Sequence, residues 1–155
     1  MSEQRFLVDT IGKLLRPAGF KKKSDSWYLP SEETISVINL QKSDFGKLYF
    51  VNIGVLLKCI CKEDFPKEYK CHIRFRWTSL IPQDEKKLER LMDFNDEIIS
   101  DADRLREISR LLEAFILPFF SSAKTLDGLR KLFKSDNWPV CLVNVKAQEV
   151  LRREV

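Results

Sequence analysis

The sequence ISVINLQKSDFGKLYFVNIGVLLKCI, residues 35–60, decides the fold. It holds two apolar runs rich in β-branched and aromatic residues, 35–43 and 47–60, which the short polar segment SDFGK joins. Two such runs around a polar turn predict a hairpin at the centre of an antiparallel sheet. Gly54 interrupts the second run and predicts a bulge or a close approach of another segment, because glycine adds no packing to a strand.

Amide side chains stand inside these otherwise apolar runs, at Asn39, Gln41 and Asn52. A buried amide without a hydrogen-bond partner costs roughly 1–3 kcal/mol, so buried amides are nearly always bonded. We therefore expect the three amides either to form a structural network or to line a binding surface.

The segments on either side of the hairpin predict further elements of both kinds. Apolar residues recur at helical spacing over 3–16, and 20–24 with 26–29 predicts a first strand or a broken hairpin arm. Residues 62–70 are polar and predict a loop. Residues 72–79 alternate and predict a fourth strand.

After Pro82 the apolar period changes from two to about 3.6, which predicts helices for the rest of the chain. We expect one helix over 84–99, one over 100–119 that Pro118 kinks or ends, and a short one that Thr125 caps. The sequence leaves open whether 140–145 is strand or helix.

These elements predict an α+β fold in which an N-terminal helix and several C-terminal helices pack on one face of a four-stranded antiparallel sheet. With 155 residues, 44% of them hydrophobic, we expect a single domain over 1–155. The other sheet face must be solvated or covered by something. An uncovered face is where function would lie.

Charge and hydropathy restrict location and partners. The opening MSEQRFLVDTIGKLL lacks the pattern of a secretory signal, and no apolar run approaches the roughly 20 residues of a membrane span, so we expect a cytoplasmic protein. The net charge is +4, and residues 1–80 carry 14 Lys and Arg against 9 Asp and Glu. This basic excess is compatible with a nucleic acid, an acidic protein or solubility alone.

The segments LLRPAGFKKKSDSWY, INLQKSDFG, YFVNIGV and CHIRFR occur in this order within residues 11–76. In this combination the chain resembles a bacterial family of domains of unknown function, DUF4304. The resemblance implies a cytoplasmic bacterial α+β protein and brings no reaction or catalytic residues with it. Small bacterial domains of this size and class often act as immunity partners of toxins, which suggests one hypothesis by analogy.

The sharpest candidate site combines cations of the predicted fourth strand with polar residues of the hairpin. It consists of Gln41, Ser43, Asn52, His72, Arg74 and Arg76. If the strands are neighbours, two guanidinium groups and an imidazole converge near the amides, an arrangement suited to capture of phosphate or carboxylate. The alternative is a solvated strand face whose arginines pair with acidic residues.

Catalytic and metal chemistry have less support. Cys59, Cys61, Cys71 and His72 give a C-x-C and a C-H pair without the paired C-x2-C knuckles of structural zinc sites, so we expect reduced cysteines, no metal and no cofactor. His72 is the only histidine, and Cys71 beside it would point to the opposite strand face. A hydrolase that uses His72 stays a third hypothesis, and we favour a non-enzyme.

The sequence thus favours a non-enzymatic binding protein, an immunity protein that neutralises a cognate toxin by direct binding. Aromatic and arginine side chains are the usual anchors of interfaces. The residues expected to bind are Trp27, Tyr28, Asn39, Gln41, Ser43, Asn52, His72, Arg74 and Arg76. The alternative is a nucleic-acid-binding or phosphate-binding module that uses the run Lys21, Lys22 and Lys23 with Arg74 and Arg76, although lysines also protect edge strands.

Overall fold

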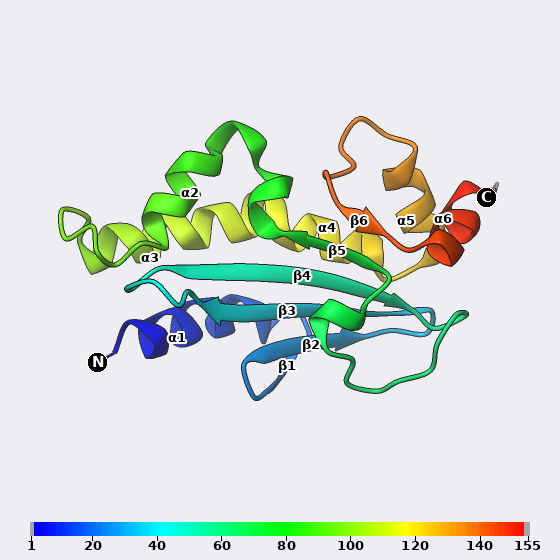
Figure 1. Ribbon diagram of the computed structural model, residues 1–155, viewed down its shortest axis with the longest axis horizontal. Coiled ribbons are helices and arrows are strands. Elements are labelled where there is room, and N and C mark those ends of the chain that lie inside the picture. Colours follow the sequence, from blue (N-terminus) through cyan, green and yellow to red (C-terminus); the bar gives the residue numbers. More distant parts are fainter. Residues whose placement is uncertain (1, 154–155) are drawn as a thin grey trace.

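The computed structural model describes residues 2–153, and its strands form one layer that helices cover on one side (Figure 1). All six strands belong to one sheet, whose order follows the sequence from β1 to β6, and each strand is antiparallel to its neighbours. The strands are β1 (Lys21–Lys23), β2 (Ser26–Pro30), β3 (Thr34–Lys42), β4 (Tyr49–Leu57), β5 (Ile73–Arg76) and β6 (Leu142–Val143).

The predicted hairpin is confirmed and is the centre of the sheet. β3 and β4 pair over nine residues each, with Asn39 opposite Asn52 and Val37 opposite Gly54. The prediction of four strands is wrong, because the sheet has six. A turn at Ser24, whose φ is +60°, divides the first arm into β1 and β2, and the short β6 pairs with β5.

The helices lie mainly before and after the strands. The α-helices are α1 (Glu3–Leu15), α2 (Glu85–Leu91), α3 (Asp101–Leu111), α4 (Leu117–Ala123), α5 (Leu126–Phe133) and α6 (Val145–Arg152). The 3-10 helices are η1 (Glu68–Lys70), η2 (Trp77–Leu80) and η3 (Pro82–Asp84), and η4 (Leu112–Ile116) is a π-helix. None of the helices within residues 2–153 combines the length and the apolar character that a membrane span requires.

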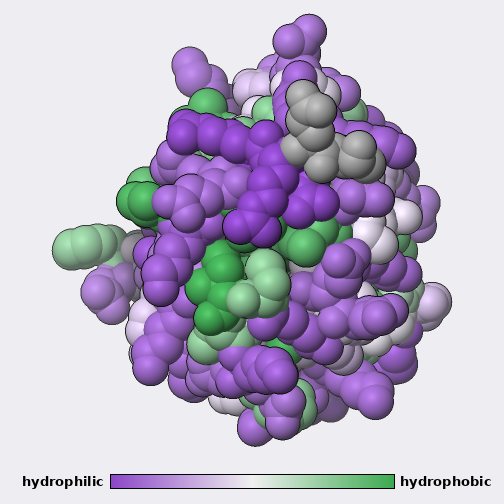
Figure 2. Space-filling view, turned by 90° about the vertical axis from the view of Figure 1, so that its right-hand side faces the viewer, coloured by the Kyte–Doolittle hydropathy of each residue, from purple (hydrophilic) through white to green (hydrophobic). Residues whose placement is uncertain are grey.

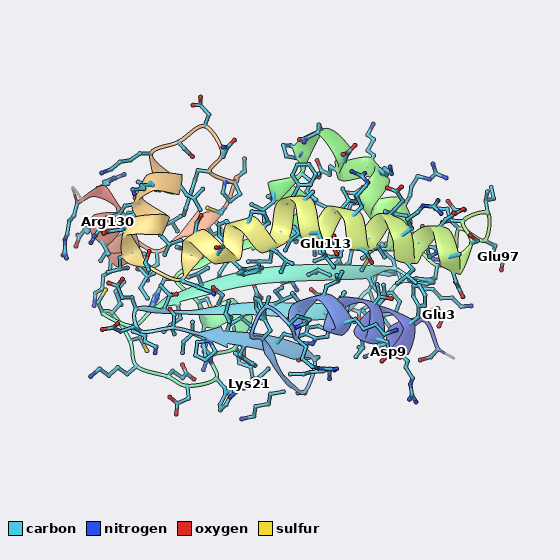
Figure 3. The ribbon with its side chains drawn as sticks, turned by 180° about the vertical axis from the view of Figure 1, so that it is seen from behind. Glu3, Asp9, Lys21, Glu97, Glu113 and Arg130 are labelled. Carbon is cyan, nitrogen blue, oxygen red and sulfur yellow. The ribbon has the colours of Figure 1, made fainter. Side chains whose placement is uncertain are left out.

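The main core lies between the sheet and the helices. Seen from behind, α1 and the long helix formed by α3, η4 and α4 cross the sheet (Figure 3). The apolar face predicted for α1 is confirmed, since Leu7, Ile11 and Leu15 are fully buried. Alternate residues of the central strands, such as Ile38 and Ile53, complete this core.

The predicted helix over 100–119 runs further than expected. It continues as α4 beyond Pro118, and the π-helical turn η4 directly precedes this proline. Within the turn the Leu117 N–H donates to the Leu112 carbonyl, so the hydrogen-bond ladder has already shifted where proline offers no N–H.

The helix predicted over 84–99 is too long, because α2 ends at Leu91. The following backbone pairs with the start of β4 instead: Tyr49 N–H donates to Met92 O, and Phe94 N–H donates to Lys47 O. The buried guanidinium of Arg104 in α3 stabilises this segment, because it donates hydrogen bonds to four carbonyl oxygens. The acceptors belong to Arg90, Leu91, Asp93 and Asp96.

Three further element boundaries can be compared with the sequence predictions. Thr125 caps α5 as predicted, with its Oγ1 accepting from Gly128 N–H. The ambiguous segment 140–145 is strand at Leu142–Val143, and α6 follows from Val145. The fourth strand is shorter than predicted, because the chain turns into η2 at Trp77.

The other face of the sheet is covered over one half only. A second, small apolar cluster forms there from Tyr28, Ile35, Val37, Leu56 and Cys71. The segment between β4 and β5, which contains η1, lies over this half on the side opposite the helices (Figure 1). The half beyond it keeps polar side chains, and we call this uncovered half the open face.

Candidate functional site

A row of polar side chains crosses the open face from strand to strand. The pairing register places Lys23 opposite Ser26, Ser26 opposite Asn39, Asn39 opposite Asn52, and Asn52 opposite Arg76. Directly opposite residues of neighbouring strands have Cβ atoms within about 5.5 Å of each other, so adjacent members of the row are neighbours in space. We call these five residues the polar row.

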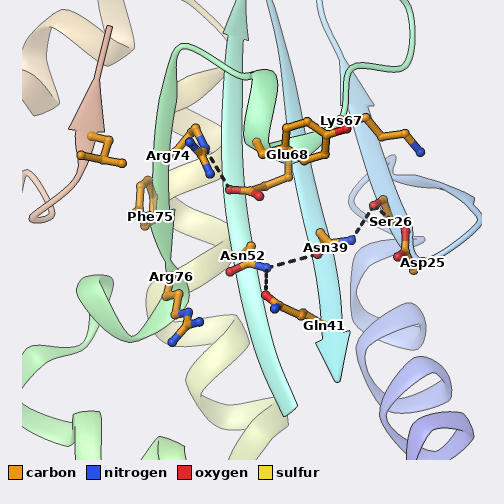
Figure 4. A pocket seen from close by; sticks show the side chains of 12 residues that line it. Asp25, Ser26, Asn39, Gln41, Asn52, Lys67, Glu68, Arg74, Phe75 and Arg76 are labelled. Atoms are coloured by element: carbon orange, nitrogen blue, oxygen red, sulfur yellow. Dashed lines mark hydrogen bonds and ion pairs between the residues drawn. The ribbon is translucent and has the colours of Figure 1, made fainter. Parts of the chain in front are cut away.

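Hydrogen bonds connect the middle of the polar row (Figure 4). Asn39 Nδ2 donates to Ser26 Oγ at 3.1 Å, and Asn52 Nδ2 donates to Asn39 Oδ1 at 3.2 Å. Asn52 Nδ2 also donates to Gln41 Oε1 at 2.9 Å. The amides thus hold each other in fixed orientations, which is the hydrogen-bonded network that the sequence offered as one of two alternatives.

The two arginines of β5 differ in their partners. Arg74 Nε lies 3.4 Å from Glu68 Oε1, and burial raises the pKa of Glu68, although the charges of Arg74 and, to a smaller extent, Arg76 oppose that shift. Arg76 instead stacks its guanidinium on the ring of Phe50, 3.9 Å from the ring centroid. Only Arg74 therefore has its charge matched by a carboxylate within the described part of the chain.

The open face is hollowed into a cavity of about 650 Å³. This volume lies within the range of roughly 300–1,000 Å³ that is usual for ligand sites. The lining residues come from β2 to β6 and from η1, together with the residues that directly precede β2 and η1. They are Asp25, Ser26, Asn39, Gln41, Asn52, Lys67, Glu68, Tyr69, Arg74, Phe75, Arg76 and Leu142.

One wall of the cavity belongs to the segment around η1, and Gly54 lets this segment approach the sheet. A Cβ atom at Gly54 would lie 2.8 Å from Cys71 Sγ and 3.2 Å from the Glu68 carbonyl oxygen. The close approach predicted at Gly54 is therefore confirmed. It brings Lys67, Glu68 and Tyr69 to the rim of the cavity.

Five residues of the predicted set line this cavity together: Asn39, Gln41, Asn52, Arg74 and Arg76. The sequence missed Ser26, although its alternation with Tyr28 on β2 was a usable signal. It also missed the residues of η1, for which the polar segment 62–70 gave no signal. A loop residue is positioned by the packing of the whole segment and not by a local period.

The other predicted residues lie elsewhere. Trp27, only 2% exposed, packs in the main core on the helix side, and Tyr28 is buried in the small cluster. Ser43 lies beyond the end of β3, where its Oγ accepts from Phe45 N–H at 3.0 Å. The expectation that Trp27 and Tyr28 stand free as surface anchors is wrong, because both rings fill apolar clusters.

His72 does not join the arginines in the cavity, so the expected convergence of an imidazole with them is wrong. The residue is 7% exposed, and its Nδ1 accepts a hydrogen bond of 2.8 Å from Leu57 N–H at the end of β4. Burial lowers the pKa of His72. The neutral ring thus serves as a side-chain acceptor that extends the sheet.

The cysteines are dispersed. Cys59 and Cys61 are exposed, while Cys71 is buried, which raises the pKa of its thiol to about 12. Cys59 lies with Ile60 and Val150 beside a shallow hollow at the end that bears the C-terminal helix, and Figure 2 shows hydrophobic residues there surrounded by hydrophilic ones. Within residues 2–153 no three His, Cys, Asp or Glu side chains are grouped to hold a metal ion.

Comparison with known proteins identifies a family. The family model described as "Domain of unknown function (DUF4304)" matches residues 11–122, which include every residue of the cavity except Leu142. No curated protein and no solved structure matched the chain. The match covers well over half of the 155 residues, and the chain therefore belongs to the DUF4304 family.

Proposed function

We propose that this protein is a non-enzymatic binding protein of the bacterial cytoplasm, an immunity protein that neutralises a cognate toxin by direct binding. The observation that carries the proposal is the cavity of about 650 Å³ on the open face, which is lined by polar groups with unused hydrogen-bonding capacity. Asn52 Oδ1 and both hydrogens on Gln41 Nε2 have no partner within the described residues.

The surroundings of the cavity suit a protein partner. Tyr69, 60% exposed, and Leu142, 68% exposed, stand at its rim beside the polar centre. Protein interfaces combine aromatic, arginine and amide side chains in this way, and a stable one buries about 800 Å² on each partner. A wide, open hollow admits side chains that project from another protein surface.

The hydrolase hypothesis receives less support. Catalysis by His72 requires a ring nitrogen that reaches substrate, whereas its Nδ1 is engaged by Leu57 N–H and its ring is buried away from the cavity. The buried thiol of Cys71, with its raised pKa, is a poor nucleophile at neutral pH. Binding therefore accounts for the open face more simply than a reaction does.

The experiment uses the product of the neighbouring gene. This gene product should be toxic when expressed alone and harmless when this protein is co-expressed with it. The two purified proteins should form a complex. A charge reversal in the cavity, Arg76→Glu, should abolish protection, whereas Arg5→Glu on the exposed side of α1 should not. A neighbour that is harmless alone, or protection that survives Arg76→Glu, would count against the proposal.

A nucleic-acid or phosphate module stays the second candidate because of one observation. Lys21, Lys22 and Lys23 form the whole of edge strand β1, all three are exposed, and Lys23 continues the polar row to the sheet edge. This candidate requires binding of RNA or DNA that weakens steeply as salt rises from about 50 to 200 mM. Fluorescence anisotropy with a labelled oligonucleotide measures it, and binding that is absent or insensitive to salt eliminates it.

A further inference from the structure

Arg76 lies against an aromatic ring and has no ion-pair partner within the described residues. The guanidinium carbon of Arg76 lies over the ring of Phe50, 3.9 Å from the ring centroid, and the side chain makes no hydrogen bond or ion pair within residues 2–153. A cation–π contact does not use the guanidinium N–H groups as hydrogen-bond donors to an oxygen acceptor, so these groups keep their capacity to donate to one. Arg76 is thus an oriented cation with unused donors.

A second donor is oriented toward the same place. Gln41 lies opposite Phe50 in the strand register, and its Oε1 accepts from Asn52 Nδ2 at 2.9 Å. Because the oxygen is engaged, the Nε2 group keeps both hydrogens for another acceptor. In Figure 4 the side chains of Gln41 and Arg76 extend toward each other from the two sides of Asn52.

The charged residues that line the cavity leave the end near Arg76 and Gln41 positive. Glu68 is engaged by Arg74, and Lys67 has no ion-pair partner within the described residues. The remaining acidic group, Asp25, belongs to the β2 end of the row, on the far side of Asn39 and Asn52 from Arg76. A ligand group that complements Arg76 therefore carries negative charge.

The arrangement fits a single carboxylate better than a nucleic-acid strand. A phosphate backbone is bound by several cations along a track and by exposed aromatic rings on which bases stack. Here the neighbouring cation, Arg74, is already paired with Glu68, so Arg76 is the one guanidinium of the cavity without an ion-pair partner in the described residues. One free guanidinium beside one amide donor matches the two oxygens of one carboxylate.

We infer that Arg76 and Gln41 receive the side-chain carboxylate of an Asp or Glu residue that the protein partner inserts into the cavity. The inference rests on the proposed function and names the chemistry by which the open face selects its partner. The Arg76 N–H groups donate to the carboxylate, Gln41 Nε2 donates a further hydrogen bond, and Asn52 fixes the orientation of Gln41.

The test titrates the full chain, labelled with ¹⁵N, with a blocked tripeptide, acetyl-Gly-Glu-Gly-amide, and with its Gln counterpart. The side-chain NH₂ signals of Asn39, Gln41 and Asn52 report binding at the site. We expect saturable shifts with the Glu peptide and none with the Gln peptide. Arg76→Gln should weaken binding at least about tenfold, and Gln41→Leu should weaken it less. Arg5→Gln, with the same loss of charge on α1, should leave it unchanged.

Equal shifts with both peptides, no saturable shift, or full binding by the Arg76→Gln variant would overturn the inference. Parallel titrations with inorganic phosphate and with a short oligonucleotide identify the source of the anion, and tighter binding of either one than of the Glu peptide overturns it too. The peptide titration involves no toxin. Its failure is therefore distinguishable from failure of the proposed function, which the co-expression experiment measures by itself.

Discussion

Gly54 of β4 lies directly against Cys71, which stands two residues before β5. A Cβ atom on Gly54 would lie 2.8 Å from Cys71 Sγ. This contact joins the segment around η1 to the sheet and so places one wall of the cavity. The conformation of Gly54 is an ordinary strand conformation, so the requirement for glycine is one of space alone.

Gly54→Ala should therefore destabilise the protein by about 1–3 kcal/mol, because overpacking forces neighbouring atoms to move. Urea denaturation followed by tryptophan fluorescence measures the loss. Gly12→Ala is the matched control, since its added Cβ would meet Trp27 Nε1 at an ordinary 3.7 Å and should be neutral or stabilising. The added Cβ would also lie 2.9 Å from Cys71 Cβ, so the double variant Gly54→Ala with Cys71→Gly, which removes both Cys71 atoms, should lose less than the sum of the single losses. A neutral Gly54→Ala would contradict the close contact.

Arg104 should be among the most sensitive positions for stability. It is 2% exposed, and its guanidinium donates to four carbonyl oxygens at the end of α2 and in the following turn. Arg104→Met leaves those acceptors without a partner and should cost about 3 kcal/mol or more. Arg104→Lys should lose an intermediate amount, because an ammonium cannot reproduce the planar fork.

The control for this position is Arg106→Met, on the exposed side of the same helix, where the side chain pairs only with Asp103. It should change the free energy of unfolding by less than about 1 kcal/mol. If denaturant titrations gave similar losses of unfolding free energy for Arg104→Met and Arg106→Met, the four hydrogen bonds of Arg104 would add no more stability than an exposed ion pair does.

His72 should make stability depend on pH just below its ordinary pKa of 6.5. Burial lowers the pKa of the folded protein, so the unfolded chain takes up the proton more readily. The free energy of unfolding should therefore be fully present above about pH 6.5 and fall as the pH decreases toward the folded pKa. His72→Asn offers an acceptor at the same bond separation and does not titrate, so its unfolding free energy should lack this fall. His72 is the only histidine in the sequence, which makes the assignment direct; equal pH profiles would refute it.

The four cysteines should separate by reactivity. Burial raises the pKa of the Cys71 thiol to about 12 and that of Cys141 to about 11, while Cys59 and Cys61 are exposed. With iodoacetamide at pH 8, peptide mass spectrometry should find Cys59 and Cys61 alkylated first and Cys71 alkylated only after denaturation. Alkylation of Cys71 as fast as Cys59 in the native protein would mean that the segment around η1 opens readily.

Local patterns were sufficient for much of the fold. The β-branched and aromatic runs 35–43 and 47–60 predicted β3 and β4, and the helical spacing of apolar residues predicted the buried face of α1, because both signals are local to one element. The helix predicted over 84–99 failed because Arg104, in the next helix, supplies hydrogen bonds that let the backbone leave the helix after Leu91. The apolar periodicity of one segment carries no information about a hydrogen-bond donor that comes from another helix.

For the site, the sequence alone determined that amides and arginines occur at alternate positions of strands, and hence that Asn39, Asn52 and Arg76 could share one face. Only the tertiary structure decided that they stand opposite one another, because register depends on which strands pair and where. It also decided which charges remain free: Glu68, brought by a loop that packs on Gly54, engages Arg74 and leaves Arg76 available. A charge is neutralised by its neighbour in space, and that neighbour becomes known only when the chain is folded.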